Sequence, residues 1–106
     1  MDGFVTQTIP IDLPAGRIAD VCRRYGVREL SLFGSVLRDD FRPDSDVDIL
    51  VCFKPDARIG LIKYHELQEE LASILGRKVD LVSKDWLNPV IRDDVIRSSK
   101  VIHGSE

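Results

Sequence analysis

The sequence predicts one small domain of the α/β or α+β class, in which a mixed β-sheet is covered by helices. Segments with a helical period of apolar residues alternate along the chain with short β-branched segments. The chain has 106 residues, of which 43% are hydrophobic, which is enough for one core and gives no sign of a second. We therefore expect a single domain over residues 1–106.

The first half of the chain predicts a helix followed by a strand. Residues 1–13 show no sustained period and are expected to be an extended or partly ordered lead-in segment. A helix is expected over 14–25, with proline as its first residue and Gly26 just past its end. Residues 28–33 alternate apolar and polar side chains and predict a strand that runs into a tight turn at Gly34-Ser35.

The second half predicts two further strands, two helices and an edge strand. Residues 47–53 are apolar and β-branched apart from one aspartate, as in a strand buried on both faces. A helix over 61–75 is expected to bury one apolar face. That face is formed by Leu61, Tyr64, Leu67, Leu71, Ile74 and Leu75. A short strand over 78–82 follows, then a helix from Asn88-Pro89 to about Arg97, and an edge strand over 100–103.

Composition and charge exclude several classes of protein. The net charge of −3 lacks the basic excess that an isolated nucleic-acid-binding domain usually carries, so no direct nucleic-acid partner is expected. No apolar run approaches the roughly 20 residues of a membrane span, and the start of the chain lacks the layout of a secretory signal. We expect a cytoplasmic protein without a membrane segment. Cys22 and Cys52 are expected as buried thiols and not as a disulfide or a metal clip.

Three aspartates lie in or beside the two later predicted strands. Asp46 and Asp48 are two residues apart, so their side chains should point to the same face, with Cα atoms roughly 6 to 7 Å apart. Asp80 is the one acidic residue of the strand over 78–82. If the two strands are neighbours, the three carboxylates converge on one surface.

Such a carboxylate cluster predicts a divalent metal and a phosphorylated ligand. Like charges raise one another's pKa, which favours the presence of cations. Mg²⁺ prefers oxygen ligands and bridges carboxylates to substrate phosphates. Two ions held by the aspartates would bracket an in-line displacement at phosphorus, which is the arrangement that nucleotidyl transfer needs.

The turn at Gly34-Ser35 predicts a phosphate-binding loop. Glycine lets the backbone come close to an anion, and successive backbone N–H groups and a hydroxyl can bind it. If Ser35 opens a short helix, its N-terminus favours a phosphate, and Arg38 can add a charge-assisted contact.

These residues together resemble the signature of a known family. Gly34-Ser35 is followed, after ten residues, by Asp46-Val47-Asp48. This pattern is similar to that of the DNA polymerase β-like nucleotidyltransferase superfamily. The resemblance extends over most of the chain, because the expected elements occur in the family's order within the size of its minimal members. Those members are similar to MntA-type antitoxins of HEPN/MNT toxin–antitoxin pairs.

The resemblance implies a role for each motif residue. Asp46 and Asp48 would bind both metal ions, and Asp80 would be the metal-bound carboxylate nearest the acceptor hydroxyl. Four residues would contact the nucleotide, and one acidic residue would support the site. These are Gly34, Ser35, Arg38 and Ser45 for the nucleotide and Asp40 as the supporting residue. The implied cofactors are two Mg²⁺ ions, which Mn²⁺ can replace, and the implied substrate is ATP.

The resemblance also implies an enzyme that transfers AMP from ATP to a hydroxyl group of a HEPN toxin, expected to be that of a tyrosine. By this modification the protein would act as the antitoxin. A HEPN protein would be the partner, in a possible hetero-oligomer. Two alternatives stay open: neutralisation of the partner by binding alone, and transfer to a small molecule such as an aminoglycoside. The three aspartates are all present, which favours the enzyme.

Other chemistry-bearing side chains have simpler interpretations. His65 and His103 are far apart in the sequence and are expected on the surface. Trp86 is expected to be a packing residue, and Tyr64 is expected to belong to the core.

Overall fold

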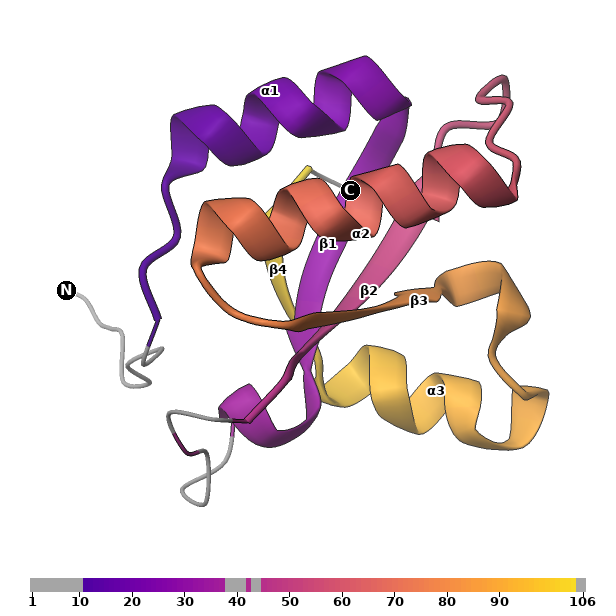
Figure 1. Ribbon diagram of the computed structural model, residues 1–106. Helices are drawn as coiled ribbons and strands as arrows, with labels where there is room; N and C mark the ends of the chain where they lie inside the picture. Colours follow the sequence, from indigo (N-terminus) through magenta and orange to yellow (C-terminus); the bar gives the residue numbers. More distant parts are fainter. Residues whose placement is uncertain (1–10, 38–41, 43–44, 105–106) are drawn as a thin grey trace, which may run out of the picture.

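A computed structural model describes residues 11–37, 42 and 45–104, apart from the side chain of Ser35. The described residues form three α-helices, two short 3-10 helices and four strands. In chain order they are α1 (Ala15–Tyr25), β1 (Val27–Phe33), η2 (Gly34–Leu37), β2 (Val47–Phe53), α2 (Leu61–Leu75), β3 (Val79–Ser83), η3 (Lys84–Trp86), α3 (Pro89–Ser98) and β4 (Lys100–His103). Helices α1 and α2 lie on one side of the sheet, and α3 lies on the other (Figure 1). The predicted fold class is confirmed.

The four strands form a mixed sheet in the order β3-β2-β1-β4. Strand β1 is antiparallel to both β2 and β4, whereas β2 and β3 are parallel. Parallel neighbours need a crossover connection, and α2 provides it. Along β2, Val47, Ile49 and Val51 are fully buried, while Asp48 between them is only half-buried. Because strand side chains alternate between faces, Asp48 lies on the face away from α1 and α2.

The core lies between the sheet and the helices α1 and α2. Its fully buried side chains come from both helices and from the two inner strands, and include Ile18, Val21, Leu30, Leu32, Val47, Ile49, Val51, Leu67 and Leu71. Cys22 is also buried, and burial raises the pKa of its thiol to about 12. Cys52 is half-buried, and both cysteines are free thiols.

The ends of the helices follow local capping rules only in part, because neither α1 nor α2 has a side-chain cap at its start. Gly26 ends α1 in the left-handed conformation, with φ 68°, as expected of a glycine in this position. Asn88 caps α3 by accepting a hydrogen bond from the N–H of Val90 at 2.8 Å. Pro14 was expected to be the first helical residue, which is wrong. Its ψ of 99° is extended, so it precedes α1 as the cap residue and the helix begins at Ala15.

Two apolar residues lie elsewhere than the sequence predicts. Leu61 was expected on the buried face of α2 but is 80% exposed, because the first turn of that helix extends beyond the sheet and α1. Trp86 was expected to be a packing residue but is 66% exposed, although its ring centroid lies 5.1 Å from that of Tyr64. None of the helices that the described residues form is long and apolar enough to cross a membrane.

The lead-in segment and the connections show smaller differences. Residues 1–10 lie outside the described part of the chain, but Ile11 and Leu13 pack against the core. Strand β3 begins one residue later than expected, and the short helix η3 after it was not predicted.

Helices α1 and α2 are joined by a polar contact around Glu70. Arg24 donates hydrogen bonds of 3.0 and 2.8 Å to the Glu70 carboxylate, and the Tyr25 hydroxyl donates one of 2.7 Å. The hydrogen bonds from Arg24 and then from Tyr25 lower the pKa of Glu70 from 4.5 to about 2. The carboxylate therefore binds its proton less tightly in the folded state than in the unfolded state.

This contact predicts a loss of stability in acid. Its contribution is present above the unfolded pKa of 4.5 and disappears as the pH falls toward about 2. We expect Glu70→Gln to lower the free energy of unfolding at pH 7, with a difference from wild type that shrinks as the pH falls through this window. Urea unfolding at a series of pH values measures it. Glu69→Gln on the same helix is the control, and a difference for Glu70→Gln that does not vary with pH would contradict the prediction.

Candidate active site

The structure places Asp48 and Asp80 opposite each other on neighbouring strands. In the parallel register of β2 and β3, Asp48 pairs with Asp80 and Val47 with Val79. The Val47 N–H continues this ladder by donating to the carbonyl of Lys78 at 2.9 Å. The expectation that the Asp80 strand lies beside the Asp48 strand is therefore confirmed. Paired residues of adjacent strands are about 4.8 Å apart, so the two carboxylates share one face at short range.

Asp46 lies just before β2, two residues ahead of Asp48. Asp46 and Asp80 are exposed, whereas Asp48 is half-buried. Among the described residues, no group of three or more His, Cys, Asp and Glu side chains is arranged so that it could hold a metal ion. The chemistry of the three aspartates nevertheless fits Mg²⁺, which takes carboxylate oxygens as ligands. Because two of the three side chains are exposed, they have room to turn toward an ion.

The backbone at Gly34 lies directly against Asp48. Strand β1 ends at Phe33, which pairs with Asp48, and Gly34 follows with a φ of 77°. A Cβ atom at position 34 would collide with Oδ2 of Asp48. Glycine is therefore required here both for its left-handed conformation and for the close approach. The start of η2, which the sequence predicts to bind phosphate, thus lies next to the carboxylates.

The other predicted nucleotide-binding residues are placed less completely. Arg38 and Asp40 lie outside the described residues, and for Ser35 only the backbone, within η2, is described. The Ser45 hydroxyl accepts a hydrogen bond of 3.0 Å from the N–H of Arg42, and its own N–H donates to the Arg42 carbonyl at 2.9 Å. Ser45 thus closes a turn immediately before Asp46. Its contact with a nucleotide stays a prediction.

Two residues of α2 hold the outer edge of β3, and sequence reasoning did not find them. The Tyr64 hydroxyl donates a hydrogen bond of 2.7 Å to the carbonyl of Leu81. The Leu81 N–H donates one of 3.0 Å to Oε1 of Gln68. Both backbone groups that an edge strand would leave unpaired next to Asp80 are therefore satisfied, and this part of the edge is closed to another strand. The spacing of four residues between Tyr64 and Gln68, which puts them on one helix face, was the available signal.

The phenol of Tyr64 is close enough to sense the charge of Asp80. Burial, and after it the negative charge of Asp80, raise the pKa of Tyr64. The hydroxyl therefore stays protonated at neutral pH and remains a hydrogen-bond donor to Leu81. The ring also packs against Phe53 and Trp86, with centroids 6.3 and 5.1 Å away.

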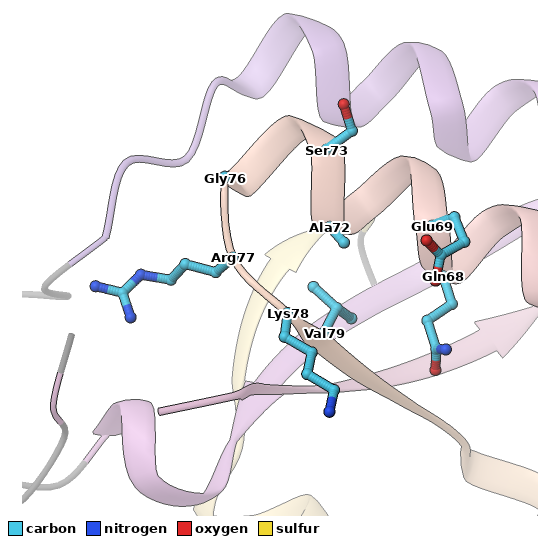
Figure 2. A pocket seen from close by; sticks show the side chains of 8 residues that line it. All are labelled: Gln68, Glu69, Ala72, Ser73, Gly76, Arg77, Lys78 and Val79. Carbon is cyan, nitrogen blue, oxygen red and sulfur yellow. The ribbon is translucent and has the colours of Figure 1, made fainter. Parts of the chain in front are cut away.

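A pocket of about 510 Å³ lies beside the start of β3 (Figure 2). It is lined by the second half of α2 and by the residues that lead into β3, namely Gln68, Glu69, Ala72, Ser73, Gly76, Arg77, Lys78 and Val79. Arg77 extends away from Gln68 and Glu69 (Figure 2) and donates a 3.3 Å hydrogen bond to the carbonyl of Arg42. Lys78 directly precedes β3 and lines the same pocket. Two basic residues thus lie beside the start of β3.

Comparisons with known proteins agree with this arrangement. The model of a family described as a nucleotidyltransferase domain matches residues 17–102. The protein adenylyltransferase MntA of Thermococcus cleftensis is 47% identical over 74 residues, which cover 70% of this chain and 73% of the relative. The resemblance that the sequence analysis stated is confirmed.

Solved structures show the same fold. A chain in a crystal structure described as a toxin–antitoxin with AMP-PNP superposes with a TM-score of 0.70 at 28% identity, covering 89% of this chain and 76% of the other. A chain in the complex of the MNT antitoxin with the tri-AMPylated HEPN toxin of Shewanella oneidensis superposes with a TM-score of 0.61. Its identity is also 28%, and the match covers 86% of this chain and 70% of the other.

The close approach at Gly34 predicts the effect of adding one methyl group. Gly34→Ala places a Cβ against Asp48 at a positive φ, and we expect it to lower the free energy of unfolding by about 1–2 kcal/mol. The matched control is Gly16→Ala, because Gly16 lies in α1 with nothing within 4 Å of an added Cβ. That change should leave stability unchanged or raise it. Urea unfolding of both variants measures the difference, and equal effects would contradict the role of Gly34.

The contact between Gln68 and Leu81 predicts a local effect on β3. Gln68→Met removes the acceptor for the Leu81 N–H, and we expect this amide to exchange with solvent about tenfold faster. Gln68→Glu keeps an acceptor oxygen and should retain most of the protection. Amide hydrogen exchange followed by NMR measures both variants. If the two variants protect the Leu81 amide equally, the side chain does not hold the edge of β3.

Proposed function

We propose a specific reaction for this chain, which belongs to the nucleotidyltransferase domain family: transfer of AMP from ATP to a hydroxyl group of a partner protein. The expected partner is a HEPN-class toxin, the expected acceptor is a tyrosine, and the modification would neutralise the toxin. The chain is an enzyme of this family. The observation that carries the proposal is the register that sets Asp80 opposite Asp48, with Gly34 packed against Asp48 on the other side.

The order of the strands supports a direction for the reaction. Gly34 follows β1, Asp48 lies in β2, and Asp80 lies in β3, so the three positions succeed one another across the sheet. We assign the triphosphate to the backbone N–H groups at the start of η2, where glycine permits a close approach. The acceptor hydroxyl then approaches from the side of β3. The α-phosphorus lies between them, near Asp46 and Asp48.

The transfer is a displacement at the α-phosphorus. The acceptor oxygen forms a bond to this phosphorus, the bond to the bridging oxygen of the β-phosphate breaks, and pyrophosphate leaves. Asp46, Asp48 and Asp80 would hold Mg²⁺, which would supply the positive charge that this chemistry needs. Asp80 is exposed at the outer strand, where it orients the acceptor hydroxyl and accepts its proton as the bond to phosphorus forms.

Two features favour transfer over neutralisation by binding alone. All three aspartates are present, and two of them are held in register by a closed strand edge. The relatives support the same choice. The MntA of Thermococcus cleftensis is named a protein adenylyltransferase, and the Shewanella oneidensis toxin in complex with its MNT antitoxin carries AMP groups. A hetero-oligomer with a HEPN protein follows as the expected assembly.

The proposed role of Asp80 can be separated from that of nucleotide binding. We expect Asp80→Asn to bind MgATP nearly as well as wild type but to transfer AMP at least about 100-fold more slowly, because the carboxylate acts mainly in the transition state. Calorimetric titration with a non-hydrolysable ATP analogue gives the affinity. Mass spectrometry of the HEPN protein over time gives the rate of AMP addition.

Two variants complete this experiment. Asp48→Asn should weaken nucleotide binding in Mg²⁺, because Asp48 lies between Gly34 and Asp80 in the proposed metal site. Glu69→Gln makes a similar change at an exposed carboxylate outside the site and should leave both measurements unchanged. Transfer at the wild-type rate by Asp80→Asn would place this residue outside the active site, and a wild-type protein that never modifies the HEPN protein would overturn the proposed acceptor.

A further inference from the structure

Large apolar side chains are exposed around one pocket of the protein. Leu61 and Ile62 form the first turn of α2 and are 80% and 76% exposed, and Trp86 in η3 is 66% exposed. Leu61 and Trp86 line a pocket of about 510 Å³ together with Phe53 and Tyr64. Single exposed apolar residues are ordinary, but several around one hollow mark a surface that another molecule covers.

A strongly basic pocket adjoins this apolar one. The second pocket has a volume of about 410 Å³ and shares Lys54, Ala57 and Ile59 with the first. Its charged lining comprises five basic residues and one acidic residue, in a chain whose net charge is −3. The basic residues are Arg23, Arg24, Lys54, Arg58 and Lys63, and the acidic residue is Asp56.

Three of these basic residues form no ion pair with another described residue. Arg23 and Arg24 are paired with carboxylates of α1 and α2. Within the described part of the chain, Lys54, Arg58 and Lys63 form no ion pair. Lys63 lies over the ring of Tyr25, 6.0 Å from its centroid, but is not neutralised by a carboxylate, so an anionic group that approaches this pocket meets positive charge.

The two pockets lie at the other end of β2 from Asp46 and Asp48, while Tyr64 and Ser83 of the apolar pocket lie nearer to Asp80. The loop after β2, the start of α2 and η3 are gathered on the right of Figure 1, whereas β2 begins at its lower left. Asp46 and Asp48 lie at the start of β2, and Phe53 is its last residue. The five residue steps from Asp48 to Phe53 span roughly 17 Å, so a molecule bound at these pockets does not cover Asp46 and Asp48.

We propose that these residues form a docking surface for the partner protein, with an apolar centre of Leu61, Ile62 and Trp86 and a basic flank of Lys54, Arg58 and Lys63. The proposal rests on the proposed function and specifies how the acceptor protein is held. The complementary face of the partner is apolar at its centre and acidic beside it. An apolar centre with an aromatic anchor and a charged margin is the usual composition of a protein interface.

Two other occupants fit the surface less well. A nucleic acid would match the basic flank but would leave the aliphatic side chains of Leu61 and Ile62 without an apolar partner. A second copy of this chain related by a two-fold axis would set basic residues against basic residues, which repels. An acidic and apolar protein face satisfies both halves of the docking surface.

The test uses two substitutions that should not unfold the protein. Leu61→Asp and Lys63→Glu each put an acidic residue into the first turn of α2, which has none, and the helix dipole favours acids there. Ala15→Asp and Arg17→Glu are the matched controls, because they put the same acids at the same positions of α1. The first turn of α1 lies at the opposite side of the molecule (Figure 1).

We expect Leu61→Asp and Lys63→Glu each to weaken binding of the HEPN protein about tenfold or more, measured by calorimetric titration, and the controls to bind as wild type. Lys63→Glu should also reduce the dependence of affinity on salt. In AMP transfer, both variants should raise the KM for the HEPN protein while kcat and MgATP affinity stay at wild-type values.

Several outcomes would overturn the docking surface. Wild-type affinity in both variants would place the interface elsewhere. Light scattering that shows a dimer of the wild type, lost in Leu61→Asp, would assign the surface to a second copy. Binding of a labelled single-stranded RNA that Lys63→Glu abolishes and Leu61→Asp preserves would assign it to nucleic acid. A wild-type protein that neither binds nor modifies the HEPN protein removes the proposed function first, and this surface with it.

Discussion

The parallel pairing of β2 with β3 is the constraint on which the site depends, because it determines which side chains of the two strands face each other. Val47 pairs with Val79 and Asp48 with Asp80. Apolar residues therefore meet on the face covered by α1 and α2, and carboxylates meet on the opposite face. Since side chains alternate with a period of two, a slip of one residue would turn Asp80 toward the core and Val79 toward the aspartates. The same register therefore both buries the apolar residues and brings the carboxylates together.

Helix α2 makes this register unique in two ways. It is the crossover that parallel strands require, and its buried residues Leu67 and Leu71 fix it against the sheet. Its polar residues Tyr64 and Gln68 then bind both free backbone groups of Leu81, the residue after Asp80. An edge strand held only by β2 would have one side open to water. With α2 on its outer edge, β3 is fixed from both sides at the position where the chemistry is proposed to occur.

The sequence predicted the elements well where a single physical rule decides them. The bounds of β2, α2 and β4 follow from apolar periodicity and from the glycines that end helices, and the structure has them as expected. The sequence also allowed the adjacency of Asp48 and Asp80 to be predicted, because the order strand, helix, strand favours a parallel pair of strands. Periodicity in the sequence does not show how much of a helix is covered by the sheet and by the neighbouring helix. Leu61 has the period of the buried face of α2, yet nothing in the described part of the chain covers it.

Contacts that join distant segments were beyond the sequence for a different reason. The hydrogen bonds of Gln68 and Tyr64 to Leu81 depend on the distance between a helix and a strand edge, which no local pattern encodes. The same holds for the reciprocal hydrogen bonds of Ser45 and Arg42, where a residue expected to contact a nucleotide also shapes the turn before Asp46. In both cases the residue type indicated a polar role, and only the fold could tell which group it binds.

The first turn of α2 departs from the sequence features that usually stabilise the start of a helix. Helix α3 begins with an asparagine cap and a proline, as a helix should on local grounds. Helix α2 has Gly60 as its N-cap residue and no side-chain cap, and its first two residues, Leu61 and Ile62, are exposed. Helix α3 also exposes Val90 in its first turn, and none of the three α-helices of the described residues has an acid there. The start of α2 differs from that of α3 in lacking a side-chain cap and in lying beside Lys54, Arg58 and Lys63. Natural sequences depart from local consistency mainly where another requirement applies. An apolar helix start without a side-chain cap, beside cations that form no ion pair within the described part of the chain, therefore fits the proposed docking surface better than the stability of this domain alone.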